Sequence, residues 1–162
     1  FSQKERNVMS SIKYLLLVVI TLIVFPAFGE KINPNFDAKL AEKYNADEYG
    51  MKGFVLVILK TGSNTFEDKK SKAKLFNGHM ENIEKLVEDK KLIVAGPLGK
   101  NDKSYRGIFI LDVATLEEAE ILLQTDPAIK AELLTPELYQ WYGSAALAEY
   151  LEVSDKIWKK SP

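Results

Sequence analysis

The spacing of apolar and polar positions predicts regular structure through the middle of the chain. Residues 54–59 (FVLVIL) form an unbroken apolar run of strand length, bounded by Gly53 and the turn residues 61–64. A run of this kind is typical of a strand buried on both faces. Over residues 68–90 the pattern changes, and apolar side chains recur every three or four positions between charged ones, at Ala73, Phe76, Met80, Ile83 and Val87. This period predicts a helix with one apolar face.

The next segments predict a hairpin. Residues 92–95 have the composition of a short strand that ends at Gly96-Pro97, and residues 99–102 are turn formers. Residues 105–112 then supply the returning strand.

A second helix and a final strand follow the hairpin. Thr115 and Glu118 have the spacing of a capping box, in which each side chain satisfies the other's free backbone donor, so a helix is expected from there to about Thr125. Residues 137–142 predict the last strand, and an amphipathic tail follows from about residue 145 to residue 159.

The order strand, helix, strand, strand, helix, strand predicts an α+β fold of the ferredoxin-like, split β-α-β type, with an antiparallel sheet and both helices on one face. The first and third strands are apolar at consecutive positions, so both faces of the sheet need cover. A second copy of the chain would bury the open face, which predicts a homodimer. The tail helix folding over the sheet is the alternative, and its modest length makes it the weaker one.

The N-terminal part has the pattern of an export signal. Lys13 precedes an apolar run over residues 14–25, and small residues follow just before Glu30. The run falls short of the roughly 20 apolar residues that a spanning helix needs, so a cleaved signal is favoured over a membrane anchor. We therefore expect an exported protein, periplasmic or secreted, that meets a membrane only through an uncleaved signal segment.

These patterns divide the chain into four parts. Residues 1–29 hold the signal peptide and upstream residues, because Met9 is a conventional start and residues 1–8 precede it. Residues 30–52 form a linker that opens on a turn at residues 33–35 and contains a short helix from Asp37, with Leu40 and Tyr44 on the side expected to lie against the main domain. Residues 53–144 form the α+β domain, and residues 145–162 form a C-terminal helical tail.

Composition excludes several classes of function. The formal net charge is -1, so the chain has no excess of positive charge with which to bind nucleic acid. It has no cysteine, which removes disulfides, thiolate metal sites and a cysteine nucleophile. We find no phosphate-binding glycine loop, no nucleophile elbow and no paired histidines for zinc, so neither a metal nor a cofactor is expected.

His79 is the only histidine of the chain, and its helical position places it within the apolar stripe. An imidazole there can act as a general base, a general acid or a ligand near neutral pH. The alternative is a core histidine satisfied by a backbone carbonyl.

Asp126, Gly96, Pro97 and Gly107 have both structural and functional interpretations. Asp126 before Pro127 is a favoured way to begin a new helical turn, and it could equally be the carboxylate partner of His79; the two roles are compatible. The glycines and Pro97 are typical of turns and close backbone approaches, and they could also let a ligand come near backbone donors at a strand end.

In combination these segments resemble the YciI-like (YCII-related) family. The resemblance covers roughly residues 49–150 and rests on residues 78–83 (GHMENI), 91–98 (KLIVAGPL), 106–109 (RGIF), 117–119 (EEA) and 125–128 (TDPA), with residues 141–145 (WYGSA) typical of an exported branch. It implies a dimeric α+β barrel, in which two ferredoxin-like sheets face each other, and an active-site His-Asp pair that corresponds to His79 and Asp126. One member of the wider family is linked to dehydrochlorination of an aromatic degradation intermediate, so the analogy is to acid-base lyase or isomerase chemistry.

The main functional hypothesis is therefore a cofactor-independent enzyme of the lyase, isomerase or hydrolase type. In it His79, oriented by Asp126, moves a proton on a small organic molecule in a cavity between sheet and helices, and Gly96, Pro97 and Gly107 contact the substrate. The alternative is a binding module that holds a small ligand without chemistry. A third hypothesis is haem binding through His79, which a single histidine permits and nothing else in the sequence supports.

Overall fold

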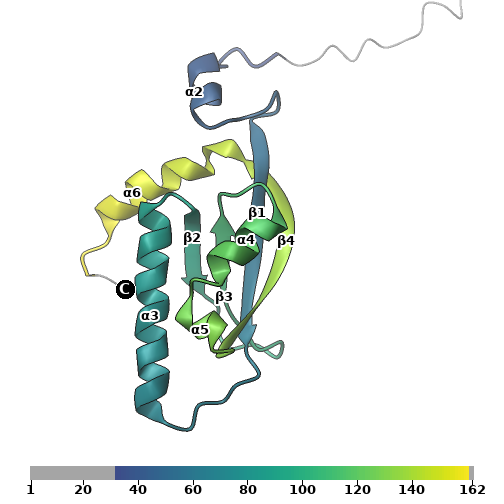
Figure 1. Cartoon of the computed structure of the whole chain (residues 1–162). Coiled ribbons are helices and arrows are strands. Elements are labelled where there is room, and N and C mark those ends of the chain that lie inside the picture. The colour runs from purple at the N-terminus through teal and green to yellow at the C-terminus, as the bar shows by residue number, and fades with distance from the viewer. Residues whose placement is uncertain (1–31, 161–162) are drawn as a thin grey trace, which may run out of the picture. The chain divides into compact units, whose positions relative to one another are not determined.

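The computed structural model of the chain describes residues 32–160, and within them four strands form one antiparallel sheet (Figure 1). The strands are β1 (Met51–Thr61), β2 (Leu92–Pro97), β3 (Tyr105–Leu111) and β4 (Leu134–Ser144), in the spatial order β2-β3-β1-β4. All neighbouring pairs are antiparallel. This confirms the α+β, split β-α-β fold that the order of elements predicts.

Helices cover one face of the sheet, as Figure 1 shows. These helices are α3 (Lys69–Glu88), α4 (Leu116–Leu123) and α5 (Pro127–Lys130). A further helix, α2 (Ala38–Lys43), precedes β1, and the tail forms a 3-10 turn, η1 (Ala145–Glu149), followed by α6 (Tyr150–Ile157). The Asp68 carboxylate caps α3, and hydrogen bonds from the Ser71 hydroxyl and from the Lys70 and Ser71 backbone hold its pKa below the usual range.

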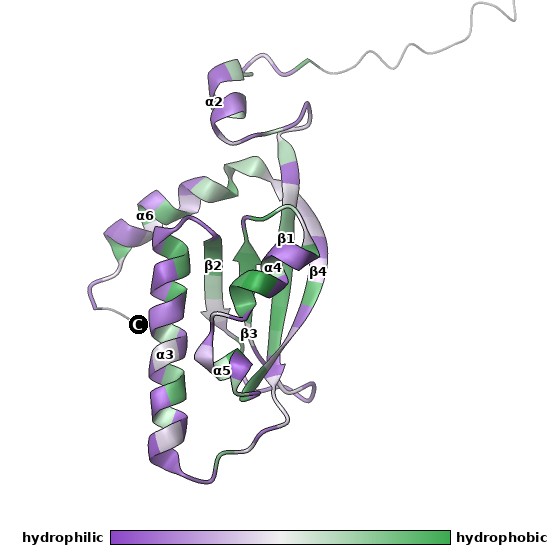
Figure 2. Ribbon diagram, in the orientation of Figure 1, coloured by the Kyte–Doolittle hydropathy of each residue, from purple (hydrophilic) through white to green (hydrophobic). Residues whose placement is uncertain are grey.

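The strand register separates two unequal faces. Val55, Val57 and Leu59 of β1 point towards the helices and are buried, together with Phe109 and Leu111 of β3. On the opposite face, half-buried apolar side chains alternate with these, at Leu56, Ile58, Val94, Ile108 and Ile110. Within residues 32–160, the prediction that the first strand is buried on both faces holds on this opposite face only at Phe54, because the helices that cover the sheet lie on the other side. Figure 2 shows the hydrophobic residues that fill most of β1.

The inward face of α3 also differs from the expected one. His79, Asn82 and Leu86 are its buried residues, whereas Phe76 is half exposed. The expected inward position of His79 is confirmed, but the apolar pattern did not include Asn82, because a search for apolar periodicity counts an amide as surface. Helix α3 therefore presents hydrogen-bonding groups to the core.

Element boundaries agree with the pattern to within a few residues, with small corrections. Strand β4 is longer than predicted at both ends, since its ladder with β1 continues through polar pairs such as Lys60 with Thr135. Strand β2 runs on through Gly96-Pro97 instead of ending before them. In the capping box, Thr115 Oγ1 accepts from Glu118 N at 3.1 Å as expected, but the Glu118 carboxylate accepts from Ala114 N instead.

The segments at either end of the domain bury little. Helix α2 has no buried residue, and an ion pair of 3.1 Å between Lys43 Nζ and Glu149 Oε1 joins it to η1. The prediction that Leu40 lies against the domain is therefore wrong, since its side chain is half exposed. Helix α6 also buries none of its residues, so it is not the cover that the open sheet face requires.

The predicted turn at residues 33–35 is confirmed by a hydrogen bond from Phe36 N to Asn33 O. The predicted signal peptide lies outside the described residues. Among residues 32–160, no helix combines the length and apolar character needed to cross a bilayer.

Helices α3 and α5 approach closely at Gly78. A Cβ atom at this position would lie 2.9 Å from Cγ of the Pro127 ring. Such a contact is shorter than real Cβ atoms tolerate, and the proline ring is too rigid to move aside easily. Glycine at this point therefore lets the N-terminus of α5 sit against α3.

We expect Gly78→Ala to lower the thermal unfolding midpoint, although a Gly-to-Ala change inside a helix ordinarily stabilises by about 1 kcal/mol. The double variant Gly78→Ala/Pro127→Ala should recover much of the loss, because the collision partner is shortened. Gly99→Ala is the control, since nothing lies within 4 Å of its added Cβ. A higher midpoint for Gly78→Ala would contradict the close contact.

Candidate active site

His79 lies on the inward face of α3, between two aromatic rings. Its imidazole is nearly parallel to the Phe109 ring on β3, with centroids 5.9 Å apart and planes at 22°. The Phe76 ring lies 5.6 Å away on the helix itself. Only 6% of the residue is exposed, so the ring is enclosed between helix and sheet.

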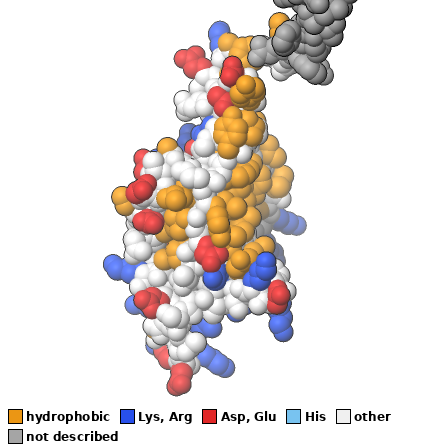
Figure 3. Space-filling view, turned by 90° about the vertical axis from the view of Figure 1, so that its right-hand side faces the viewer, with side chains coloured by type: hydrophobic (Ala, Val, Ile, Leu, Met, Phe, Trp, Pro, Cys, Tyr) orange, Lys and Arg blue, Asp and Glu red, His pale blue; other side chains and the backbone are white. Residues whose placement is uncertain are grey.

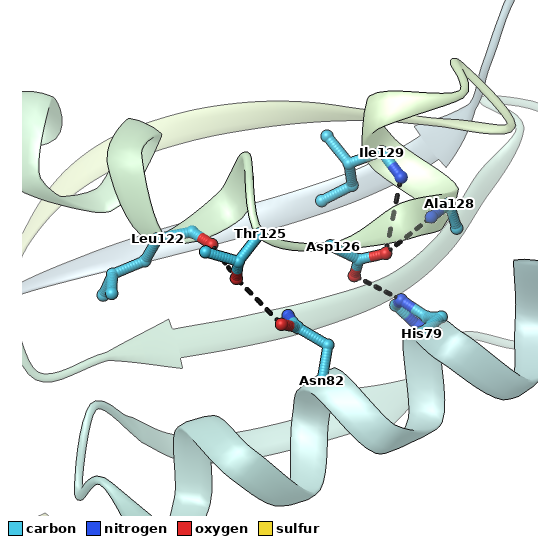
Figure 4. Close-up of polar contacts among 7 residues, drawn as sticks. All are labelled: His79, Asn82, Leu122, Thr125, Asp126, Ala128 and Ile129. Carbon is cyan, nitrogen blue, oxygen red and sulfur yellow. Dashed lines mark hydrogen bonds and ion pairs between the residues drawn. The ribbon is translucent and has the colours of Figure 1, made fainter.

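Asp126 is fully buried and uses both carboxylate oxygens (Figure 4). Oδ1 accepts hydrogen bonds from Ala128 N at 2.8 Å and Ile129 N at 3.4 Å, which makes Asp126 the N-cap of α5. Oδ2 lies 2.5 Å from Nδ1 of His79. The sequence leaves two interpretations of Asp126, a helix cap and a partner of His79. Asp126 has both roles at once, each through a different carboxylate oxygen.

This contact determines which imidazole nitrogen is free. An ionised carboxylate can only accept, so Nδ1 of a neutral His79 carries the proton and Nε2 keeps its lone pair. Within residues 32–160, the imidazole makes one hydrogen bond, at Nδ1, and Nε2 makes none. A histidine oriented by a carboxylate, with its second nitrogen unpaired, is the arrangement of a general base.

The glycines of the hairpin fall on different faces of the sheet. Gly107 pairs with Pro97 and shares the helix-facing side with Phe109, the strand neighbour of His79. Gly96 pairs with Ile108 and belongs to the opposite face. A Cβ at Gly107 would lie 2.9 Å from Gly96 O, which gives this glycine a packing reason of its own. The structure therefore brings Gly107 and Pro97, but not Gly96, to the side where His79 lies.

A cavity of about 610 Å³ opens between α3 and α5, on the other side of the Gly78–Pro127 contact. Its lining combines apolar side chains with polar ones; it consists of Phe66, Ser71, Lys74, Leu75, Asn77, Gly78, Glu81, Pro127 and Ala131. Neither His79 nor Asp126 lines it, which differs from the expected cavity between sheet and helices. The Phe76 and Phe109 rings flank the imidazole, and the Asp126 carboxylate lies at its Nδ1 atom.

Asn82 and Thr125 are polar residues near the pair that the motif search did not single out. Asn82 is buried one turn beyond His79 on α3, and its amide lies 2.8 Å from the hydroxyl of Thr125 (Figure 4). The sequence held one signal for Asn82: it lies three residues after His79, a spacing that places these two side chains on one helix face. In the described part of the chain, no three acidic or histidine side chains are grouped as a metal site would require.

Comparison with solved structures finds a similar chain, 5-chloro-2-hydroxyhydroquinone dehydrochlorinase from Burkholderia phenoliruptrix AC1100 in complex with 2,5-dihydroxybenzoquinone. The two sequences are 21% identical, the match covers 54% of this chain and 92% of that chain, and the TM-score is 0.39. No curated protein matches the chain.

Residues 54–141 match the sequence model of the YCII-related domain. The matched span is more than half of the 162 residues and runs from the start of the apolar run in β1 to Trp141 in β4. It includes His79, Asp126 and the hairpin that joins β2 to β3. The family resemblance of the sequence motifs is thereby confirmed, and the chain belongs to the YCII-related domain family.

Proposed function

We propose that the protein is a cofactor-independent enzyme in which His79 transfers a proton on a small organic molecule. The observation that carries this proposal is the 2.5 Å contact between Nδ1 of His79 and a fully buried carboxylate, which leaves Nε2 without a partner in the described part of the chain. A histidine that served only to fill the core would need no buried carboxylate, because one backbone carbonyl would satisfy it.

The proposed chemistry runs through Nε2. It accepts a proton from an acidic C–H or O–H group of the substrate, and the positive charge that forms on the imidazole is stabilised by the Asp126 carboxylate. Returning the proton to another carbon completes an isomerisation, and returning it to a leaving group completes an elimination. If the proton is taken from water instead, the water oxygen attacks an electrophilic carbon of the substrate, and passing the proton to the group that leaves completes a hydrolysis. In each case the backbone N–H groups of Ala128 and Ile129 keep Asp126 in place while His79 gains and loses a proton.

One observation favours the second candidate function, a binding module without chemistry. The cavity has a volume typical of small-molecule sites, yet His79 and Asp126 do not line it. A ligand held there would contact Leu75, Lys74 and Pro127 and would leave the imidazole untouched.

Deuterium exchange separates the two functions without knowledge of the substrate. The full chain is incubated in D₂O with a panel of cyclic ketones, enones and hydroxyquinones, and loss of acidic C–H signals is followed by proton NMR. We expect exchange of at least one compound, falling by roughly 10²–10⁴-fold in His79→Gln and also decreasing in Asp126→Asn. The control is Ala131→Phe, which partly fills the cavity and should leave the exchange rate near that of the wild type.

Two results would count against the enzyme. One is that the wild type exchanges no compound faster than His79→Gln does. The other is that a panel compound binds, with an affinity lost in Ala131→Phe and kept in His79→Gln. The second result would establish the cavity as the site of a binding module.

We also propose a homodimer formed through the open face of the sheet. Figure 3, which views the side of the molecule that carries β4 and β1, shows hydrophobic side chains gathered along it. The register places Leu56, Ile58, Ile108 and Ile110 on this face as half-buried residues, and Tyr139 is 48% exposed beside them. An apolar sheet face of this extent is typical of an interface between chains.

Charged pairs border this apolar face at the two ends of β1. Lys52 Nζ lies 2.6 Å from Asp112 Oδ1, and Lys60 Nζ lies 2.7 Å from Glu137 Oε1. The hydrogen bond to Glu137 raises the pKa of Lys60 and lowers the pKa of Glu137, so both stay ionised near neutral pH. An apolar centre with a charged border is the usual anatomy of a protein interface.

Light scattering after size-exclusion chromatography tests the dimer. The wild type should have the mass of two chains, and Leu56→Glu should have the mass of one, because a carboxylate would be buried without a partner in the interface. Ile121→Glu is the matched control: its side chain is 71% exposed on the helical side, and it should leave the mass unchanged. A single-chain mass for the wild type would exclude the dimer.

We propose, finally, that the protein is exported, on the basis of Lys13 and the apolar run over residues 14–25. Mass spectrometry of protein recovered outside the cytoplasm should find an N-terminus near Glu30. Val18→Arg places a charge inside the apolar run and should retain the full-length chain in the cytoplasm, whereas Val18→Leu should not. Recovery of uncleaved wild-type protein from the cytoplasm alone would contradict export.

A further inference from the structure

Three consecutive residues, the last two of the α4–α5 connection and the first of α5, each contact α3, and Figure 4 shows the contacts of the first two. The pairs are Thr125 with Asn82, Asp126 with His79, and Pro127 with Gly78. The residue numbers rise along one segment as they fall along the other, so the two segments pair in opposite directions. Asp126 is therefore flanked on one side by a hydrogen bond and on the other by a close van der Waals contact. Its carboxylate can move relative to α3 only if one of these neighbours is released.

The amide of Asn82 is buried but only partly hydrogen-bonded. The Thr125 hydroxyl lies 2.8 Å from Asn82 Oδ1 and 2.6 Å from Leu122 O, and it has a single proton to donate. Both oxygens can only accept, so Leu122 O and Asn82 Oδ1 share this one proton in a three-centre hydrogen bond.

One end of the amide has no partner. Nδ2 of Asn82 is buried and makes no hydrogen bond to any group among residues 32–160. Asn82 is 8% exposed, and burying an amide with one end unpaired costs free energy that an apolar side chain would not. Leucine fits this side of α3 at two nearby positions. Leu75 lies one turn before His79, and Leu86 lies one turn after Asn82.

We infer that Asn82 is a positioning residue for the His79–Asp126 pair, an inference that rests on the proposed function of that pair. Through Thr125 it holds the residue next to Asp126 against α3, one turn along the helix from His79. The carboxylate then stays within hydrogen-bond distance of Nδ1 and keeps the free lone pair on Nε2. Stability of the fold by itself would favour leucine at position 82.

The single histidine makes the test specific. The full chain is produced without a polyhistidine tag and labelled with ¹⁵N-histidine, so that every imidazole signal comes from His79. In the wild type we expect a protonated Nδ1 with a downfield, slowly exchanging proton. Asn82→Leu should unfold at the same temperature as the wild type or a higher one, while solvent exchange of that proton becomes roughly fivefold faster, the factor expected for one net hydrogen bond.

Thr125 supplies a matched pair of controls that does not depend on a buried substitution, because its side chain is at the surface. Thr125→Val removes the hydroxyl and should accelerate the exchange as Asn82→Leu does. Thr125→Ser keeps the hydroxyl and should behave as the wild type.

The possible failures of this inference can be told apart. A wild type in which Nδ1 carries no slowly exchanging proton would overturn the pair and, with it, both the proposed function and this inference. A wild type with that proton, whose exchange is unchanged in Asn82→Leu and Thr125→Val, would overturn the positioning role alone. A lower unfolding temperature in Asn82→Leu with unchanged exchange would make Asn82 a structural residue.

Discussion

The arrangement of the helical layer depends on one buried carboxylate. Asp126 has no exposed surface, and a charge in such a place is tolerated only when its oxygens are hydrogen-bonded. Oδ1 is used by the first turn of α5 and Oδ2 by His79 of α3. One side chain therefore starts one helix and fixes its distance from another, so the position of α5 and the orientation of the imidazole are coupled. Loss of either partner would leave a buried charge incompletely satisfied.

The sheet shows a different kind of constraint, because its two faces are both apolar but only one is covered. Residues such as Val57 pack beneath the helices, while the alternating Leu56 and Ile58 remain half-buried. Neither α2 nor α6 buries any of its residues, so no helix among residues 32–160 covers this face. The site and the proposed interface thus lie on opposite sides of one sheet, and β1 and β3 contribute to both.

The His-Asp pair and the cavity are separated by the contact of Gly78 with Pro127. Gly78 precedes His79, and Pro127 follows Asp126. The two residues that form the helix contact beside the His-Asp pair therefore also line the cavity. The cavity and the His-Asp pair thus lie next to the same contact between α3 and α5. This proximity is the structural link between the enzyme and binding hypotheses.

The sequence by itself determined the elements, because a strand or helix period is imposed by backbone geometry over a few neighbouring residues. It also identified His79 and Asp126 as candidates, the first as an inward histidine and the second as a helix cap. Only the tertiary structure decided that these side chains, 47 positions apart, are in contact. It also decided that Gly96 and Gly107 lie on opposite faces of the sheet and that the centre of the α3 face is polar. Such outcomes depend on strand register and on the pairing of polar groups across the core, which local patterns do not contain.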